Sequence, residues 1–326
     1  MNLFDKVNPI FNIDEEMNEL LNNINLKLND IKITDKQKRK YMITKSKVRS
    51  IHSSLAIEAN SLSLFDVKNI SEHKQIIGKR DEIQEVKNAI EAYDKINDYD
   101  YKSEKDFIEV HGLMMKYFDE DNGGYRNHGE GVEKDGKVIY MAPESLLVPS
   151  LMKSLFEFIN NSDMNIILLS AIFHYYFVAI HPFSDGNGRL ARYWVSLMLI
   201  NYNRDFEFIP IEEEMYLNHE EYYSSIAQCH VNGNANVFIK FLLKTINSSL
   251  DKIIKSSKFV INDIQNRIIE FIINDKYITQ NSIAEKLNVN VRTVKRNFKV
   301  LIDNNIIERV GSDKNGYWEV LWNNIM

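Results

Sequence analysis

The segment HPFSDGNGRLAR, from His181 to Arg192, largely determines which fold and which kind of site the sequence predicts. Pro182 disfavours helical backbone at His181, while Gly186 and Gly188 permit backbone angles that larger residues avoid. We therefore expect a loop that leads into a helix beginning near Gly188. The free N–H groups at such a helix start, together with the helix dipole, attract phosphate groups.

The charged residues of this segment suit chemistry on a nucleotide. Arg189 and Arg192 lie three residues apart on one helix face, so both can reach the same anion. Asp185 supplies the kind of carboxylate that holds Mg²⁺ together with phosphate oxygens and water. His181 can take a proton from an attacking hydroxyl, because its unperturbed pKa lies near neutral pH. A base, a metal ligand and an anion site together favour transfer of part of a nucleotide.

The same residues also fit simpler, structural interpretations. A histidine before a proline, or an Asp-Gly-Asn-Gly turn, is more often structural than functional, so only their joint occurrence at fixed spacing favours a site. GNGRLA, residues 186–191, also fits the loose dinucleotide-binding pattern G-x-G-x-x-A, but that pattern must follow a strand. Helical sequence lies on both sides of the segment, which argues against dinucleotide binding.

Composition limits the class of protein. The 326 residues are 44% hydrophobic and 26% charged, with 12 Gly and 5 Pro, which favours a mainly helical globular chain of more than one domain. A net charge of −6 means that binding to nucleic acid or anionic lipid would need a local basic patch. The apolar run 166–180 is too short for a membrane helix and contains His174, so we expect a buried core helix and no membrane partner. A single cysteine, Cys229, and the lack of a secretory signal predict a cytoplasmic protein.

Helical spacing of apolar residues recurs along most of the chain. It predicts helices at residues 14–28, 36–59, 81–96, 105–118, 148–160, 166–180, 190–202, 221–230 and 236–257. GEGVEKDGKVIYMAP, with Asp135-Gly136 between alternating apolar residues, instead predicts a β-hairpin with a tight turn. After residue 258, three helical stretches and two short strands follow in the order of a winged helix-turn-helix.

Every defining position of HPFSDGNGRLAR matches the signature of Fic-domain proteins, His-Pro-Phe-x-Asp/Glu-Gly-Asn-Gly-Arg-x-x-Arg. The chain resembles that family over residues 50–245, including GGYRNHGEGV, YMAPESLLVPSLM, FHYYFVAI and EEYYSSIAQ. The resemblance implies a Fic-type helical bundle with a β-hairpin flap. It also implies Mg²⁺-dependent transfer of AMP from ATP to a Ser, Thr or Tyr hydroxyl of a target protein or of the enzyme itself, releasing pyrophosphate.

The resemblance also implies roles for individual residues. His181 would deprotonate the target hydroxyl, and Asp185 would bind Mg²⁺. Tyr223 would lie near the adenine or ribose, and Phe183 would point into the core. The phosphates would be bound by an anion hole and two arginines: Gly186, Asn187, Gly188, Arg189 and Arg192. The flap would align the target segment, partly by strand addition, through Val132, Val138, Ile139, Tyr140 and Met141.

SSLAIEAN, residues 53–60, suggests regulation of this site. Taken alone, Glu58 is most simply a helix-end carboxylate that faces water. The resemblance implies an inhibitory helix at about 34–59, because Ser54 and Glu58 match the family pattern Ser/Thr-x-x-x-Glu-Gly/Asn, whose glutamate pairs with the second arginine of the motif, Arg192.

The inhibitory pattern is matched with one departure. Ala59 stands where the family has Gly or Asn, and we expect Asn60 to supply the left-handed helix stop instead. Some relatives use the same glutamate to remove AMP, so a bifunctional or de-AMPylating enzyme is an alternative. A homodimer is a further expectation.

We therefore predict three parts: an N-terminal helical region (1–100), a Fic catalytic core (101–257) and a winged helix-turn-helix domain (258–326). The predicted recognition helix of the last part has a polar basic face, whose candidate DNA-binding residues are Arg292, Thr293, Lys295, Arg296 and Lys299. Asn297 is also expected on this face. Residues 259–326 contain nine Lys/Arg and eight Asp/Glu, a net charge of +1, so non-specific attraction to DNA is modest. DNA binding and a protein-recognition or dimer role both stay open.

A different functional class is a DNA-binding transcription regulator whose Fic-like body senses a nucleotide. Because a sensor could lose His181 or Asp185 and still bind, the filled catalytic positions favour the enzyme. His174 and Cys229 are expected only to pack in the core, and His230 has no assigned role.

Overall fold

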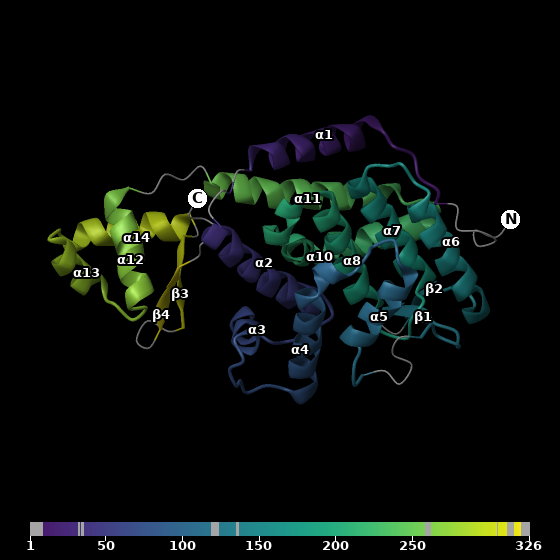
Figure 1. Ribbon diagram of the computed structural model, residues 1–326, viewed down its shortest axis with the longest axis horizontal. Helices are drawn as coiled ribbons and strands as arrows, with labels where there is room; N and C mark the ends of the chain where they lie inside the picture. Colours follow the sequence, from purple (N-terminus) through teal and green to yellow (C-terminus); the bar gives the residue numbers. More distant parts are fainter. Residues whose placement is uncertain are drawn as a thin grey trace. The chain divides into compact units, whose positions relative to one another are not determined.

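The computed structural model describes residues 9–31, 33, 36–118, 124–134, 137–257, 262–304, 306–311 and 316–320 (Figure 1). The chain divides into two compact units, one of Met1–Leu28 and Ser46–Ser249, the other of Asn29–Lys45 and Leu250–Met326. Both are mainly helical, and each has one antiparallel strand pair among its described residues. The predicted mainly helical class is confirmed.

The first unit contains the hairpin and most of the helices. Its strands β1 and β2 pair from Gly131↔Met141 to Lys134↔Lys137, with an irregularity after Val132. The predicted turn residues Asp135 and Gly136 lie outside the described residues. In chain order its α-helices and strands are α1 (Glu15–Asp30), α2 (Lys36–Ile57), α3 (Leu64–Ser71), α4 (Arg80–Asp94), α5 (Glu104–Met114), β1 (Gly131–Lys134), β2 (Lys137–Met141), α6 (Val148–Asn160), α7 (Ile166–Ile180), α8 (Asn187–Tyr202), α9 (Ile211–Leu217), α10 (His219–Asn232) and α11 (Asn236–Ser257). Residues 29–30 of α1, 36–45 of α2 and 250–257 of α11 belong to the second unit.

Helix α7 forms the centre of the first unit, as its apolar run predicts. Nearly all of its side chains are buried, and it packs against α6 and α8. Phe107 of α5 is fully buried and meets Phe177 of α7 and Trp194 of α8 edge-on, with ring centroids 4.8 and 4.9 Å apart. None of the described helices combines the length and apolar character needed to cross a membrane. This rigid core fixes the loop between α7 and α8.

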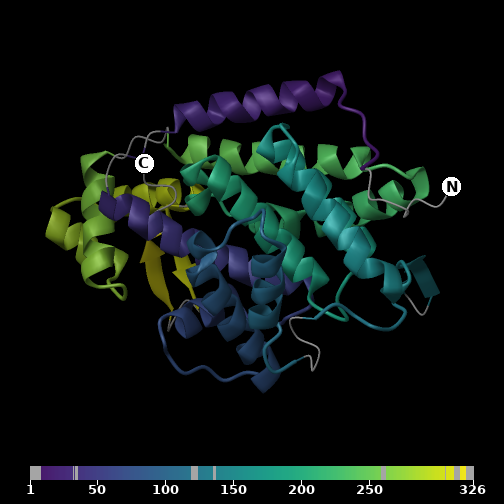
Figure 2. The ribbon, with the colours of Figure 1, turned by 45° about the vertical axis from the view of Figure 1, so that its right-hand side comes forward.

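Helix α1 lies alongside α11 in both ribbon views (Figures 1 and 2). Lys240 of α11 forms ion pairs with Asp14, at 2.6 Å, and with Glu16, at 2.7 Å. Lys27 of α1 donates to the side-chain oxygen of Asn247 at 2.7 Å. These contacts hold the N-terminal helix against the bundle.

The second unit has the predicted order of a winged helix-turn-helix: α12 (Asp263–Asn274), α13 (Gln280–Leu287), α14 (Val291–Asp303), β3 (Ile307–Val310) and β4 (Tyr317–Val320). Its core includes Ile268, Val294, Phe298 and Leu301. The prediction that Asn297 belongs to the polar face is wrong, because Asn297 is buried and donates to the Thr293 carbonyl.

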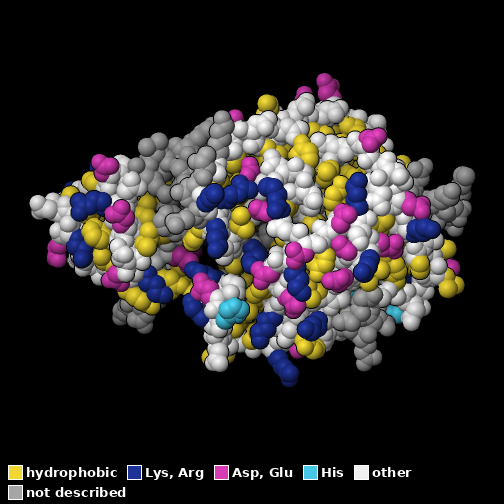
Figure 3. All heavy atoms as spheres, in the orientation of Figure 1, with side chains coloured by type: hydrophobic (Ala, Val, Ile, Leu, Met, Phe, Trp, Pro, Cys, Tyr) yellow, Lys and Arg dark blue, Asp and Glu magenta, His cyan; other side chains and the backbone are white. Residues whose placement is uncertain are grey.

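On the face that Figure 3 shows, acidic and basic side chains are interspersed over much of the surface, in line with the small net charge of the whole chain.

Candidate functional site

The predicted loop lies between α7 and α8. His181 ends α7 with left-handed backbone (φ 50°), and its N–H donates to Phe177 O at 3.0 Å. Asn187 begins α8, one residue before the predicted start, and its side chain closes the loop onto Phe183. Asn187 Oδ1 accepts from Phe183 N at 3.1 Å, and Nδ2 donates to Phe183 O at 2.7 Å. The loop shape is therefore set by the residue types of the motif.

Arg126, which the sequence argument missed, fastens this loop from outside the motif. Its side chain is buried, and Nε donates to His181 O at 2.7 Å. Nη1 donates to His128 O at 2.6 Å and Nη2 to Pro143 O at 2.5 Å, while the Arg126 N–H donates to Pro182 O at 2.9 Å. One guanidinium thus joins the loop to both ends of the hairpin. Its position in GGYRNHGEGV, among the segments that resemble the Fic family, was the available signal.

Gly186 is required by the packing beneath the loop. Its φ is +81°, and a Cβ there would lie 2.7 Å from the sulfur of Met115. His111 Nε2 donates to Asp185 O at 2.9 Å, and the His111 ring stacks on Phe183 with centroids 3.6 Å apart. Phe183 is fully buried, so it points into the core, as expected.

The imidazole of His181 is half-buried at the end of α7. Burial lowers its pKa below the usual value of 6.5, although the carboxylates of Glu130 and Asp185 act in the opposite direction. His181 is therefore mostly unprotonated at neutral pH, which is the form that a general base requires.

Arg192 is the most enclosed charge of the motif, and its side chain has no exposed surface. Nη2 lies 2.6 Å from Glu58 Oε1 and donates to Ser54 O at 2.9 Å, while Nε donates to Ser54 Oγ at 3.0 Å. Burial alone would lower the pKa of Arg192, but attraction to Glu58 and Tyr222 raises it above its usual value. The two residues predicted for the inhibitory pattern therefore both contact this arginine.

Tyr222 and His174 extend this network. Arg192 Nη1 donates to the Tyr222 hydroxyl at 3.4 Å, so that hydroxyl directs its own proton toward His174 Nε2, 3.0 Å away. Burial, with the Arg192 charge, lowers the pKa of His174 to about 3, which keeps Nε2 available as an acceptor. The prediction that His174 only packs is wrong, because His174 orients the Tyr222 hydroxyl, which accepts a hydrogen bond from Arg192. Helical spacing alone could not distinguish a packed histidine from a bonded one.

Glu58 also covers the start of α8. A Cβ atom at Gly188 would overlap Glu58 Oε1 and lie 3.1 Å from Arg192 Nη1. The carboxylate therefore occupies the space next to the helix N-terminus, where the anion hole is expected. An incoming phosphate group would meet a negative charge already in place.

Arg189 and Asp185 pair with each other in this structure. Arg189 Nη2 lies 2.8 Å from Asp185 Oδ2, and Nη1 lies 3.0 Å from Glu85 Oε1. Asp185 is 67% exposed, and no group of three or more His, Cys, Asp or Glu side chains suited to a metal occurs among the described residues. An exposed single carboxylate fits Mg²⁺ that brings its other ligands as phosphate oxygens and water. Sequence reasoning missed Glu85.

The end of the predicted inhibitory segment, defined as residues 54–60 and called the inhibitory segment below, differs from the expectation. Ala59, not Asn60, takes the left-handed conformation, with φ 65°. Asn60 instead uses its side chain, donating from Nδ2 to Glu85 Oε2 at 2.7 Å. The helix stop is thus made by a residue with a Cβ, in a conformation that glycine adopts with less strain.

The flap and α10 meet beside the loop. Tyr140 OH donates to Ala179 O at 2.7 Å, and its ring stacks on His230 with centroids 3.9 Å apart. Tyr140 therefore anchors β2, while Met141 is exposed; the side chains of Val132, Val138 and Ile139 lie outside the described residues. Tyr223 is 46% exposed and donates to Ile57 O at 3.3 Å, next to the inhibitory segment.

In the second unit, the basic residues of α14 lie on one exposed face. They are spaced three, one and three residues apart, with Thr293 half-buried at the edge: Arg292, Lys295, Arg296 and Lys299. The arrangement leaves the apolar face of α14 for the core of that unit.

Residues 101–199 match the Fic/DOC family. Residues 261–308 match the winged helix-turn-helix DNA-binding family. Among solved structures, a Fic family protein from Desulfovibrio desulfuricans is similar with a TM-score of 0.74 and 28% identity, over 96% of this chain and 98% of that one. The Fic-type bundle followed by a winged helix, predicted from the sequence, is confirmed.

Two protein adenylyltransferases are similar to this chain over part of their length. Protein adenylyltransferase Fic of Culex quinquefasciatus is 27% identical over 221 residues, which are 63% of this chain and 41% of the relative. Protein adenylyltransferase fic-1 of Caenorhabditis elegans is 24% identical over 259 residues, 74% and 47% of the two chains. The chain thus spans less than half the length of these Fic relatives. A structure of Fic-1 from C. elegans, at 23% identity and a TM-score of 0.60 over 75% of this chain and 72% of that one, supports the fold alone.

Replacing Ala59 with glycine should stabilise the protein by about 1 kcal/mol, because it removes the left-handed strain of a residue with a Cβ. The free energy of unfolding in urea measures this. Ala56→Gly, three residues earlier in the helical part of α2, is the matched control and should destabilise by about 1 kcal/mol. Equal losses for both variants would contradict the strain at Ala59.

Proposed function

We propose that this chain is an autoinhibited protein adenylyltransferase, which transfers AMP from ATP to a Ser, Thr or Tyr hydroxyl of a target protein or of itself. The observation that carries the proposal is the contact of Glu58 with Arg192, at 2.6 Å, at the mouth of a loop with every residue of the transfer motif. The match of residues 101–199 and the names of the relatives support the same activity.

The chemistry follows from the residues at the loop. Unprotonated His181 takes the proton of the target hydroxyl, and the oxygen then attacks the α-phosphorus of ATP. The bond between that phosphorus and the bridging oxygen breaks, and pyrophosphate leaves with the electron pair. Arg189, Arg192 and the N–H groups at the start of α8 stabilise the phosphate charge. Asp185 would hold Mg²⁺, which neutralises phosphate charge when it is bound.

Inhibition is a competition for Arg192. In the described state its donors go to Glu58, Ser54 and Tyr222, so a γ-phosphate would have to displace the carboxylate. Removing one partner of a buried pair is costly unless another anion replaces it. ATP binds weakly, or with its α-phosphate out of line, as long as Glu58 stays.

Removing Glu58 should release the activity. In a reaction with Mg²⁺ and ATP labelled at the α-phosphate, Glu58→Gly is expected to increase protein labelling by about tenfold, the equivalent of about 1.4 kcal/mol. Adding His181→Ala to this variant should abolish the label. The matched control is Glu72→Gly, which removes a glutamate at the end of a different helix, where it pairs with Lys74. Labelling of this variant should equal that of the unchanged protein.

The label also separates the alternatives. Transfer of label to protein from ATP labelled at the γ-phosphate would indicate phosphorylation. Loss of AMP from pre-labelled protein that requires Glu58 would favour the bifunctional or de-AMPylating enzyme. No label from either ATP in Glu58→Gly, together with sequence-specific DNA binding, would replace the proposal with the nucleotide-sensing regulator.

The pH dependence should reflect His181. Because burial lowers its pKa below 6.5, the base stays unprotonated into mildly acidic solution. The value of kcat/KM for Glu58→Gly should be constant near neutral pH and fall as pH drops through a midpoint below 6.5. An acid limb with a midpoint above 7 would contradict His181 as the base in this environment.

DNA binding by the second unit is a second candidate function. The exposed basic face of α14 and the match of residues 261–308 favour it. Arg292→Ala with Arg296→Ala should weaken binding to duplex DNA and lower the slope of log K against log salt by up to about 1.8, since each lost phosphate contact removes about 0.9. Arg267→Ala with Lys286→Ala removes the same charge from α12 and α13 as the control. Equal losses for both pairs would argue against recognition by α14.

A further inference from the structure

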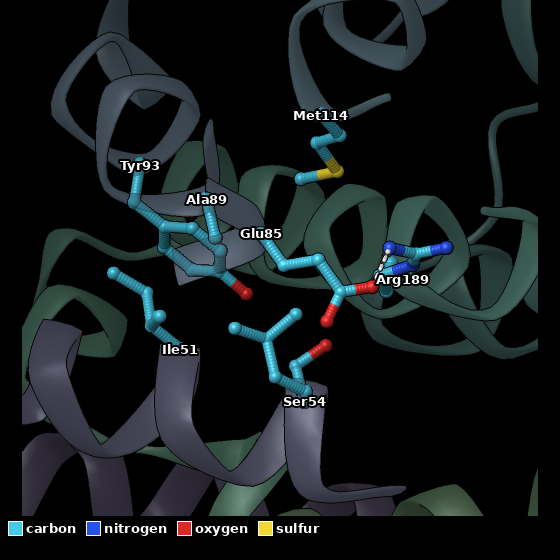
Figure 4. Close-up of a pocket in the computed structure, with 8 residues that line it drawn as sticks. Ile51, Ser54, Glu85, Ala89, Tyr93, Met114 and Arg189 are labelled. Carbon is cyan, nitrogen blue, oxygen red and sulfur yellow. Dashed lines mark hydrogen bonds and ion pairs between the residues drawn. The ribbon is translucent and has the colours of Figure 1, made fainter. Parts of the chain in front are cut away.

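Glu85 of α4 contacts both the catalytic motif and the inhibitory segment. Its Oε1 accepts from Arg189 Nη1 at 3.0 Å, and its Oε2 accepts from Asn60 Nδ2 at 2.7 Å. Asn60 also donates to the carbonyl of Glu82, at 3.2 Å. Figure 4 shows the Glu85 carboxylate extended toward Arg189, with Ser54 of α2 facing the same space. A single side chain thus links Arg189 to the residue two positions after Glu58.

Arg189 depends on Glu85 because of its burial. Its side chain is only 7% exposed, and its Nε is buried without a hydrogen-bond partner. Of its two carboxylate partners, Glu85 is 23% exposed and Asp185 is 67% exposed. A buried guanidinium keeps its charge and requires an acceptor, and the better shielded carboxylate interacts with it more strongly.

A small pocket adjoins the pair. A cavity of about 10 Å³ lies between α2, α4, α5 and α8, lined by Ser54, Leu55, Glu85, Met114 and Arg189 among others (Figure 4). This volume is at the lower limit for a single water molecule. The pocket therefore has room for at most one water molecule next to Glu85 and Arg189.

We propose that Glu85 is a positioning residue with one function for each carboxylate oxygen. Oε1 holds Arg189 in place for the phosphates of ATP, and continues to do so when Asp185 turns to Mg²⁺. Oε2 fastens the inhibitory segment through Asn60 and so stabilises the state in which Glu58 blocks Arg192. The first function rests on the proposed role of Arg189 as a phosphate ligand, and the second on the proposed inhibition by Glu58.

The two functions predict opposite effects on nucleotide affinity. When Glu58 leaves Arg192, the connected Asn60 is expected to move too, so its bond to Glu85 opposes release. Weakening that bond should help ATP to bind, but only while Glu58 is present. Weakening the bond to Arg189 should harm ATP binding whether or not Glu58 is present.

The anchoring function is tested by Asn60→Asp, since aspartate keeps the Oδ1 acceptor for Leu62 N at 3.1 Å and places a carboxylate against Glu85. The dissociation constant of Mg²⁺–ATP is measured by titration calorimetry over a period without turnover. We expect at least about tenfold tighter binding in the protein that keeps Glu58, because the substitution removes both hydrogen bonds from Asn60 Nδ2, to Glu85 and to the Glu82 carbonyl, and adds repulsion from Glu85. In Glu58→Gly we expect no gain. The control is Ser61→Ala, which removes a hydrogen bond to neighbouring Glu82. It should leave the dissociation constant of Mg²⁺–ATP unchanged both with and without Glu58.

The positioning function is tested by Glu85→Gln in the Glu58→Gly background, where the inhibitory carboxylate is absent. We expect about tenfold weaker binding of Mg²⁺–ATP and a higher KM with little change in kcat, because phosphate contacts act in both the ground and transition states. In a protein that also carries Arg189→Ala, Glu85→Gln should have no further effect. Thermal unfolding of each variant shows whether the fold is retained.

Two results would overturn the proposal. One is an equal effect of Asn60→Asp on ATP binding with and without Glu58; the other is a loss from Glu85→Gln that persists in Arg189→Ala. Labelling of Glu58→Gly with α-labelled ATP keeps the two proposals apart. Absent label with the expected binding pattern refutes AMP transfer alone, whereas label without that pattern refutes the role of Glu85 alone.

Discussion

The site depends on one physical constraint: Arg192 is fully buried and has to be given anionic or carbonyl partners. In the described state these are Glu58, the Ser54 carbonyl and hydroxyl, and the Tyr222 hydroxyl. Only Glu58 brings a charge, and it is also the partner with the most access to solvent, 34% exposed. A polyphosphate can therefore replace Glu58 while the neutral partners stay, which is the physical basis of the proposed inhibition.

The remainder of the site is built from contacts that a nucleotide does not have to break. Asn187 closes the loop on Phe183, Arg126 holds the carbonyl of His181, and His174 orients Tyr222. Arg126 and Asn187 are buried and their side-chain polar groups are hydrogen-bonded, so the loop has its shape before any ligand arrives. The carboxylates that face the expected phosphate position, Asp185 and Glu58, are more exposed, at 67% and 34%. Permanent contacts are thus separated from exchangeable ones.

Much of this could be predicted from the sequence because the motif residues determine their own local structure. Proline after His181, glycine at 186 and asparagine at 187 specify a loop and a helix start, and the apolar run 166–180 gives the buried helix before it. What could not be predicted depends on pairs of residues far apart in the chain. Glu85 meets Arg189, and Arg126 meets His181, only after α4 and the hairpin pack against the bundle.

Local conformation was also predicted wrongly at two positions. Asn60 was the better left-handed residue by propensity, yet Ala59 takes that conformation, and the backbone N–H groups of Ala59 and Asn60 donate back to the carbonyls of Ala56 and Leu55. Likewise, Asn297 has a polar side chain but lies on the buried side of α14, where the backbone carbonyl of Thr293 satisfies it. In both cases a tertiary or backbone bond outweighed a preference that is visible in the sequence.

The central claim is that Glu58 and the outer phosphates compete for the same arginine. Comparing Mg²⁺–ATP with AMP tests it most directly, since AMP has no outer phosphates. The claim predicts that Glu58→Gly tightens the binding of ATP, measured by calorimetry, and leaves the binding of AMP nearly unchanged. An equal gain for both nucleotides, or no gain for ATP, would contradict it.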